Sequence, residues 1–177
     1  VADRPGGGPL HPDRGLLPAR PSDPVSTINR QLASGKDLIF TPGVYAVDRT
    51  INVQRADTVV LGLGFATLTA RNGVVPMSVA GVAGVDIAGV MFDAGPVTSP
   101  VLLRLGPPPG RHGHARGHVR SNPVDPTALQ DVFFRIGGPH VGKATVSLEV
   151  NSNDVILDDI WAWRADHGTG VGWTVNR

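Results

Sequence analysis

An aspartate and a histidine stand side by side near the end of the chain, in the segment RADHGTG. A carboxylate that orients an imidazole can make that ring a general base. Asp166 and His167 follow the last strongly apolar run, so we expect them in a loop, where functional side chains often project from a rigid scaffold. The chain has no G-x-S-x-G element, so a serine hydrolase triad is not expected. In the alternative interpretation, His167 only bonds to the backbone of a turn.

All three tryptophans lie in the same region, residues 160–176, which reads IWAWRADHGTGVGWTVN. Their flat apolar rings could lie against sugar rings. Trp161 and Trp163 are two residues apart, so on a strand they share one face. If Ile160 points inward, both tryptophans point outward, next to Arg164. We therefore take Trp161, Trp163 and Arg164 as candidate substrate-binding residues. The alternatives are a surface that another domain covers and packing in the core.

Carboxyl groups are the other source of chemistry on sugars. Cleavage of a glycosidic bond with inversion requires an acid and a base about 6.5 to 9.5 Å apart. Glu149 is the only glutamate, and in TVSLEVN the alternation directs its aliphatic neighbours inward and Glu149 outward. Glu149 is therefore a third catalytic candidate beside Asp166 and His167, although most outward charges are only solvated.

The histidine-rich segment HGHARGH could in principle hold a metal ion. His112, His114 and His118 have side chains that bind zinc. The same segment is rich in arginine, whose positive charge opposes a cation, and it lies in a proline-rich insertion. We therefore expect no metal site and no cofactor, and interpret the segment as part of a mobile surface loop.

Composition excludes several other classes of function. GLGFAT begins like a dinucleotide-binding motif, but Thr67 occupies the third glycine position and no helix pattern follows. The formal net charge is +1, so a nucleic-acid partner is not expected. The chain has no cysteine, which excludes thiolate chemistry, and it has no apolar run of about 18 residues, the length that a membrane span requires.

The elements that position these residues begin after an irregular start. Residues 1–21 are rich in Pro, Gly and Arg without a hydrophobic period, which predicts a disordered leader. In SDPVSTINRQLASG, Ser22 or Asp23 could cap a short helix that Gly35 ends. Three aliphatic side chains would share one face of this helix; they are Val25, Ile28 and Leu32.

From there on, the hydrophobic period is two and the chain repeats. The stretches IAGVMFD, LQDVFFR and LDDIWAW, which begin at Ile87, Leu129 and Leu157, have one pattern, and Leu61 begins a weaker fourth copy. Without the insertion at 107–126, the repeat unit is roughly 22 to 28 residues long, which is typical of the coils of a parallel β-helix. The third position of the pattern is Gly89, Asp131 or Asp159, which predicts a repeated turn or a hydrogen bond at a strand end.

The pattern predicts an all-β protein, a partial parallel β-helix over residues 22–177. The short amphipathic helix would cap its first coil and protect unpaired backbone groups. The chain ends at WTVNR in strand-like sequence, so we expect the helix to be incomplete at its C-terminal end.

The segment DLIFTPGVYAVDRTINVQRADTVVLGLGFATLTA resembles the opening coils of the pectate-lyase-like superfamily of right-handed, single-stranded parallel β-helices. Tyr45 stands two residues after Gly43, and Gly62 and Gly64 precede Leu68, as in that superfamily. The later run from LQDVFFRIGG to ILDDIWAWRADHGTGVGWTVN resembles more narrowly the N-terminal β-helix of bacterial relatives of the glycoside hydrolase family fifty-five β-1,3-glucanases.

The resemblance implies a secreted or cell-surface carbohydrate-active protein whose partner is a polysaccharide or oligosaccharide. In that family the general acid is a glutamate of a second β-helix, which would pack on the C-terminal coil here. The chain by itself is therefore expected to be inactive. Two alternatives are a non-catalytic glycan-binding or cell-surface solenoid and a truncated remnant without activity.

Overall fold

The computed structural model describes residues 15–108 and 121–166. This part of the chain contains one helix and eleven strands, and none of its helices is long and apolar enough to cross a membrane. In chain order the elements are β1 (Leu16–Ala19), α1 (Val25–Ala33), β2 (Asp37–Phe40), β3 (Val44–Val47), β4 (Ile51–Val53), β5 (Val59–Ala70), β6 (Met77–Val79), β7 (Asp86–Asp93), β8 (Ser99–Leu105), β9 (Thr127–Ile136), β10 (Ala144–Val150) and β11 (Val155–Arg164).

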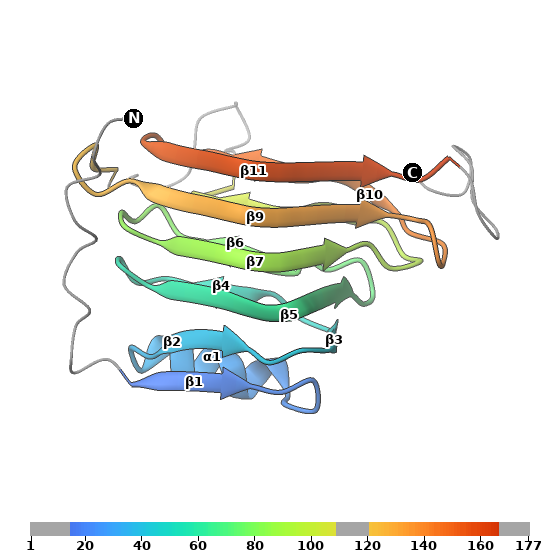
Figure 1. Cartoon of the computed structure of the whole chain (residues 1–177), viewed down its shortest axis with the longest axis horizontal. Coiled ribbons are helices and arrows are strands. Elements are labelled where there is room, and N and C mark those ends of the chain that lie inside the picture. The colour runs from blue at the N-terminus through green and yellow to red at the C-terminus, as the bar shows by residue number, and fades with distance from the viewer. Residues whose placement is uncertain (1–14, 109–120, 167–177) are drawn as a thin grey trace.

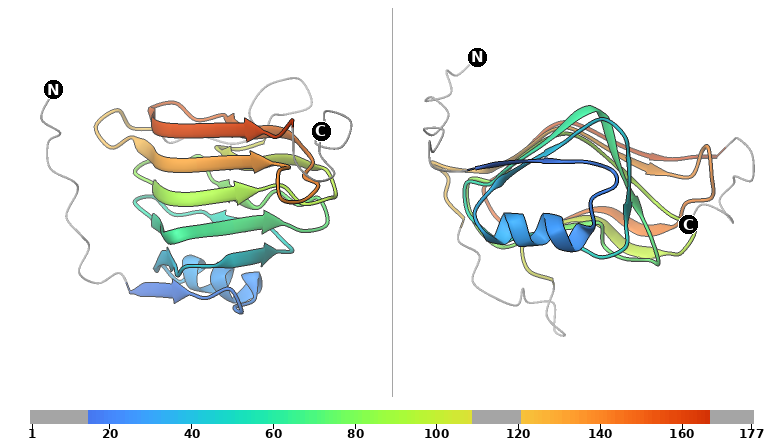
Figure 2. Two further views of the ribbon diagram at one scale, coloured as in Figure 1. Left: turned by 45° about the vertical axis from the view of Figure 1, so that its right-hand side comes forward. Right: turned by 90° about the horizontal axis from the view of Figure 1, so that it is seen from below.

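The strands form two parallel sheets, which Figure 1 shows one behind the other. The seven-stranded sheet has the order β1-β2-β5-β7-β9-β11, with β3 also paired to β5, and the four-stranded sheet has the order β10-β8-β6-β4. From β4 to β11 the chain alternates between the sheets, so each passage adds one strand to each of them. Viewed from below in Figure 2, the successive passages superpose. The prediction of a mostly β protein with parallel strands is confirmed.

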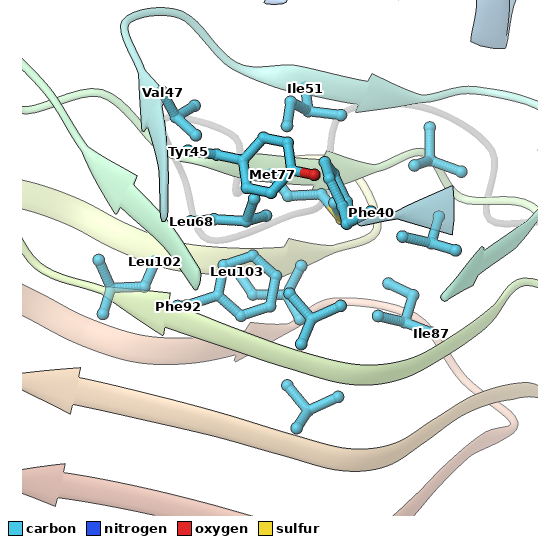
Figure 3. Close-up of a cluster of buried hydrophobic side chains, with 14 of the residues drawn as sticks. Phe40, Tyr45, Val47, Ile51, Leu68, Met77, Ile87, Phe92, Leu102 and Leu103 are labelled. Atoms are coloured by element: carbon cyan, nitrogen blue, oxygen red, sulfur yellow. The ribbon is translucent and has the colours of Figure 1, made fainter. Parts of the chain in front are cut away.

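In-register pairing places equivalent side chains of successive passages one above the other. One buried column of the seven-stranded sheet consists of Leu38, Val60, Ile87 and Leu129, and each residue is paired to the next. A second column contains Tyr45, Leu68, Phe92 and Phe134, paired in the same way. From the four-stranded sheet, Ile51, Met77 and Leu103 face these columns and complete the core (Figure 3). Because no passage can bury its apolar side chains alone, stacking is what creates the core.

The predicted repeat is correct for three copies and wrong for the fourth. Ile87, Leu129 and Leu157 pair with one another as the alignment requires. In β5, however, it is Val60 and not Leu61 that pairs with Ile87. The register shifts between Leu61 and Ala66, because β5 carries additional residues that bulge outward against a single glycine of β7.

The start of the fold differs from the prediction at two points. Residues 16–19 were expected in the disordered leader, but they form β1, which pairs with β2 and buries Ala19. The helix follows as predicted and buries Val25, Ile28 and Leu32. Its N-cap is Pro24 without a side-chain hydrogen bond, because the Asp23 carboxylate accepts the backbone N–H of Arg20 instead, at 2.8 Å.

Helix α1 closes the lower edge of the four-stranded sheet. The Asn29 amide donates to the backbone oxygen of Thr50 and accepts the N–H of Asn52, both at 2.8 Å. This one side chain therefore bonds to an edge strand as a neighbouring backbone would, which satisfies groups that could otherwise pair with another chain. The predicted capping role of the helix is confirmed for this sheet, whereas β1 covers the edge of the other.

Within the described residues, β10 and β11 are the last strands of their sheets. Their inward side chains are more exposed than the equivalents below them: Leu157 is 48% exposed, whereas its partner Leu129 is fully buried. The end of the predicted insertion is also described. Its Asp125 oxygen accepts the N–H of Gly84 at 3.0 Å, which attaches this segment to the turn before β7.

Candidate functional site

The two described tryptophans lie on the outer face of β11. Ile160 pairs with the buried Val132 and Ala162 with the buried Phe134, so the positions between them face outward. Trp161 is 63% exposed and Trp163 is 36% exposed. The predicted direction of both side chains is therefore confirmed. Trp173, the third tryptophan, lies outside the described residues.

The tryptophans are the upper end of a predominantly apolar patch. Trp161 lies above Phe133, which lies above Met91, and Trp163 lies above Arg135, because in-register strands align these positions. Together they border a shallow depression of about 280 Å³. We call it the tryptophan depression; it is lined by Met91, Phe133, Phe134, Arg135, Trp161 and Trp163.

Arg164 does not share this surface. It pairs with Ile136, which is buried, so its side chain leaves the strand on the inner side. The Arg164 guanidinium donates from Nη2 to the backbone oxygen of Ala144 at 3.0 Å. The expectation that Arg164 would stand beside the outward tryptophans is therefore wrong. Adjacent residues of a strand point to opposite faces, and Trp163 already occupies the outward position.

Asp166 is exposed just beyond the end of β11, after the buried Ala165. The Ala165 N–H donates to the oxygen of Ile136 at 2.9 Å and extends the pairing of the strand by one residue. His167 lies outside the described residues, so the predicted Asp166–His167 pair stays a prediction.

Glu149 lies on the outer face of the four-stranded sheet, as the alternation predicts. Its Oε1 accepts Arg104 Nε at 3.0 Å and the Asn151 amide at 2.6 Å. Both charged side chains of the pair are about four-fifths buried. Glu149 thus forms a structural ion pair on the four-stranded sheet, whereas the tryptophans lie on the other sheet. The structure does not bring Glu149 and the tryptophans together.

The most elaborate polar cluster involves residues that the sequence analysis did not select. Asp93, at the end of β7, is 1% exposed. Its Oδ1 accepts Arg135 Nε at 2.9 Å, and its Oδ2 lies 3.1 Å from the Thr69 hydroxyl and 2.8 Å from His140 Nε2. The other ring nitrogen of His140 lies 3.1 Å from the oxygen of Val141. A buried carboxylate therefore joins β5, β7, β9 and the loop after β9.

A second depression, of about 410 Å³, opens over this cluster. We call it the Asp93 pocket; it is lined by Val44, Thr69, Arg71, Asp93, Pro96, Arg135, His140 and Val141. Arg135 lines both depressions, so the two adjoin. The sequence held one signal for this site: the seventh position of the repeat is Asp93, Arg135 and Trp163 in successive copies, and these are the residues that the strands stack.

The third position of the pattern, where a repeated turn or a strand end was predicted, lies inside a strand in all three copies and is a local bend. Gly89, Asp131 and Asp159 have φ values of 67°, 50° and 52°, in the left-handed region that bends a strand. Stacking brings the Asp131 and Asp159 carboxyl groups together. A hydrogen bond to Asp159, with smaller contributions from desolvation and from the charges of Asp159 and Asp158, raises the pKa of Asp131 above its usual value.

Another group of acidic side chains lies at the turn before β7. Burial, a hydrogen bond to Asp57 and the charges of Asp57 and Asp86 raise the pKa of Asp125. Over residues 15–108 and 121–166, no three His, Asp or Glu side chains are arranged to hold a metal ion. His112, His114 and His118 lie outside the described residues.

Comparisons with known proteins connect this architecture to glucan hydrolysis. A family model of the LAM55 pectate lyase-like domain matches residues 16–177. An exo-β-1,3-glucanase of Streptomyces sp. (strain SirexAA-E / ActE) is 51% identical over 158 residues, which are 89% of this chain and 25% of that protein.

Two solved structures of sacteLam55A from Streptomyces sp. SirexAA-E are also similar. One has a TM-score of 0.77 at 51% identity, over 90% of this chain and 27% of that one. The other, a variant in complex with glucose, has a TM-score of 0.76 at 50% identity, over 91% and 27%. The chain thus spans about a quarter of the length of these relatives. Since the family match runs from β1 through the end of the chain, this chain belongs to the LAM55 pectate lyase-like domain family.

Proposed function

We propose that the chain is the N-terminal, right-handed parallel β-helix portion of a secreted β-glucan hydrolase, and that it forms one wall of the substrate groove. The observation that carries this proposal is the outward pair Trp161 and Trp163 above Phe133 and Met91. Exposed aromatic side chains of this size are costly on a soluble domain unless something covers them. In a relative of a glucanase, a sugar chain is the natural occupant. Because a polysaccharide cannot enter a cell, we place the protein outside it.

The catalytic acid is proposed to lie outside this chain. Glu149 is held by Arg104 and Asn151, and Asp93 is buried with three hydrogen-bonding partners. Neither carboxylate is free to approach a glycosidic oxygen. The carboxylates Asp131 and Asp159 are exposed, but they adjoin each other too closely to leave room for an inverting water between them.

The experiment combines a turnover assay with a binding assay on the 177-residue chain. We expect no reducing sugar to be released from laminarin, and we expect binding of laminarihexaose that is lost in Trp161→Ala and Trp163→Ala. Turnover that Glu149→Gln abolishes would overturn the assignment of the acid. Unchanged binding in both tryptophan variants would remove the stacking argument.

A second candidate occupant of the tryptophan depression is another β-helix domain of the same protein. It is favoured by the apolar character of the patch, which continues from the tryptophans to Phe133 and Met91. A non-catalytic glycan-binding solenoid is the third. The binding assay separates the second candidate from the other two, because a domain interface binds no oligosaccharide. Release of reducing sugar by the longer protein then separates a hydrolase from a binding module.

A further inference from the structure

We propose that the Asp93 pocket is a sugar-binding subsite, which takes one neutral hexose unit of the same glucan chain that lies on Trp163. This inference rests on the proposed function and adds to it a second group of ligand-binding residues, Arg71, Arg135 and His140. It is carried by the arrangement of hydrogen-bond donors in the pocket and by the junction of the pocket with the tryptophan depression.

The Asp93 carboxylate fixes the position of the first donor. Arg135 uses only its Nε in the bond to Asp93. Its two terminal nitrogens make no hydrogen bond to any residue of the described part of the chain, and the side chain is 27% exposed. A guanidinium carries five N–H groups, so Arg135 presents several donors whose direction is set by a buried anchor. Such preorganisation lowers the entropic cost of binding.

Arg71 supplies the second donor. It follows β5 directly, its backbone N–H bonds to Val47, and its side chain is exposed at the rim of the pocket. Over residues 15–108 and 121–166, this guanidinium has no hydrogen bond and no salt bridge. A pocket of about 410 Å³ lies in the range of small-ligand sites, about 300 to 1,000 Å³, so a hexose unit has room between the two arginines.

The choice of a neutral sugar comes from the proposed function, in which the ligand is a β-glucan. The Asp93 carboxylate lies directly behind Arg135 and compensates its charge, whereas the charge of the Arg71 guanidinium is not compensated. Hydroxyl oxygens of a hexose can accept hydrogen bonds from both guanidinium groups. The remaining positive charge would also attract an acidic sugar, so the test includes an oligogalacturonide.

The two depressions are in line. Arg135 pairs with Asp93 on one side and with Trp163 on the other. A ligand that lies on the Trp163 ring and extends downward along this column therefore passes Arg135 and enters the Asp93 pocket. An oligosaccharide of several units is required to occupy both depressions, so affinity should rise with its length.

The test measures binding of laminarihexaose and laminaribiose to the 177-residue chain by calorimetry. We expect Arg71→Ala to weaken hexaose binding about tenfold, the loss of a hydrogen bond from a charged donor, and we expect a small effect on the biose. Arg30→Ala removes an exposed arginine from α1 and is the matched control. Because Arg71 has no structural bond, the variant should keep the melting temperature of the wild type.

Each outcome decides one of the two proposals. If Trp163→Ala abolishes hexaose binding but Arg71→Ala binds as the wild type does, the subsite is refuted and the proposed function stands. If an oligogalacturonide binds more tightly than laminarihexaose, the assignment of a neutral sugar is wrong. If the wild-type chain binds no oligosaccharide, the proposed function fails and the subsite fails with it.

Discussion

Asp93 on β7 and Arg135 on β9 occupy paired positions of neighbouring strands, and the Arg135 Nε lies 2.9 Å from the Asp93 Oδ1. The two residues are 42 positions apart in the chain. This ion pair connects two features: Arg135 borders the tryptophan depression, and Asp93 holds the loop after β9 through His140. It therefore links the outer surface of the stack to the conformation of a loop.

The ion pair is expected to stabilise the fold because Asp93 is almost fully buried. Asp93→Asn removes the charge that three donors face, and we expect the free energy of unfolding to fall by about 3 kcal/mol. Urea denaturation measures this change. Asp48→Asn is the matched control, since Asp48 forms an exposed pair with Arg49, and its effect should be below about 0.5 kcal/mol. Equal effects of the two substitutions would show that the buried pair adds nothing.

The stacked carboxyl groups of Asp131 and Asp159 predict a pH dependence of stability. Their contact raises the pKa of Asp131 in the folded chain above its usual value of 3.8. Above that value the folded chain holds more protons than the unfolded chain does, so its stability falls as the pH rises through the raised pKa. We expect Asp131→Asn to raise the melting temperature more at pH 7 than at pH 3.5.

The control for this prediction must separate charge from backbone preference. Asp154 also has a left-handed φ, 52°, where asparagine is more readily accommodated than most residues. Asp154→Asn should therefore reproduce the backbone effect without the pH-dependent part. A gain for Asp131→Asn that is the same at both pH values would contradict the role of the carboxyl pair.

The Trp163 ring rests on Gly138 in the loop after β9. A Cβ atom at Gly138 would lie 3.1 Å from Cζ3 of the ring, and the φ of this residue is +104°. Gly138→Ala should displace the ring and strain the loop, and we expect laminarihexaose binding to weaken several-fold while Trp163 itself is unchanged. Gly15→Ala, whose Cβ would meet only the flexible Lys36 side chain, is the control. Wild-type affinity in Gly138→Ala would exclude a positioning role of this glycine.

Asn29 is expected to protect the edge strand β4. Asn29→Ala removes two backbone hydrogen bonds, one to Asn52 in β4 and one to Thr50 just before it. Their loss should cost about 1 to 3 kcal/mol of stability and leave strand groups open to another chain. Denaturation measures the first effect, and sedimentation at increasing concentration measures the second. Ser26→Ala alters an exposed position of the same helix and should change neither. A monomeric Asn29→Ala of unchanged stability would refute the role.

Several features of the fold were predictable because they depend on local period and on repetition. The alternation of apolar residues identified the strands, and the spacing of Ile87, Leu129 and Leu157 identified positions that the structure stacks. The same alignment placed Trp161 and Trp163 on the outer face. A period of two determines the face of a side chain without any knowledge of its neighbours.

Other features could not be read in this way. β1 is too short and too rich in polar neighbours to stand out from the leader, and it exists because β2 offers it a partner. In β5, additional residues between Leu61 and Ala66 interrupt the register with β7, so the fourth copy does not keep the spacing of the other three. In both cases the pairing with another strand, and not the local sequence, decides the structure.

The sequence by itself determined the parallel repeat, the capping helix and the outward tryptophans, because each follows from residue types at short, regular spacing. Only the tertiary structure decided which polar side chains meet. Thr69, Arg135 and His140 are 24, 42 and 47 residues from Asp93, yet all three contact its carboxylate. Stacking turns a distance of one repeat along the chain into direct contact, and the insertion between copies hides that distance from the sequence.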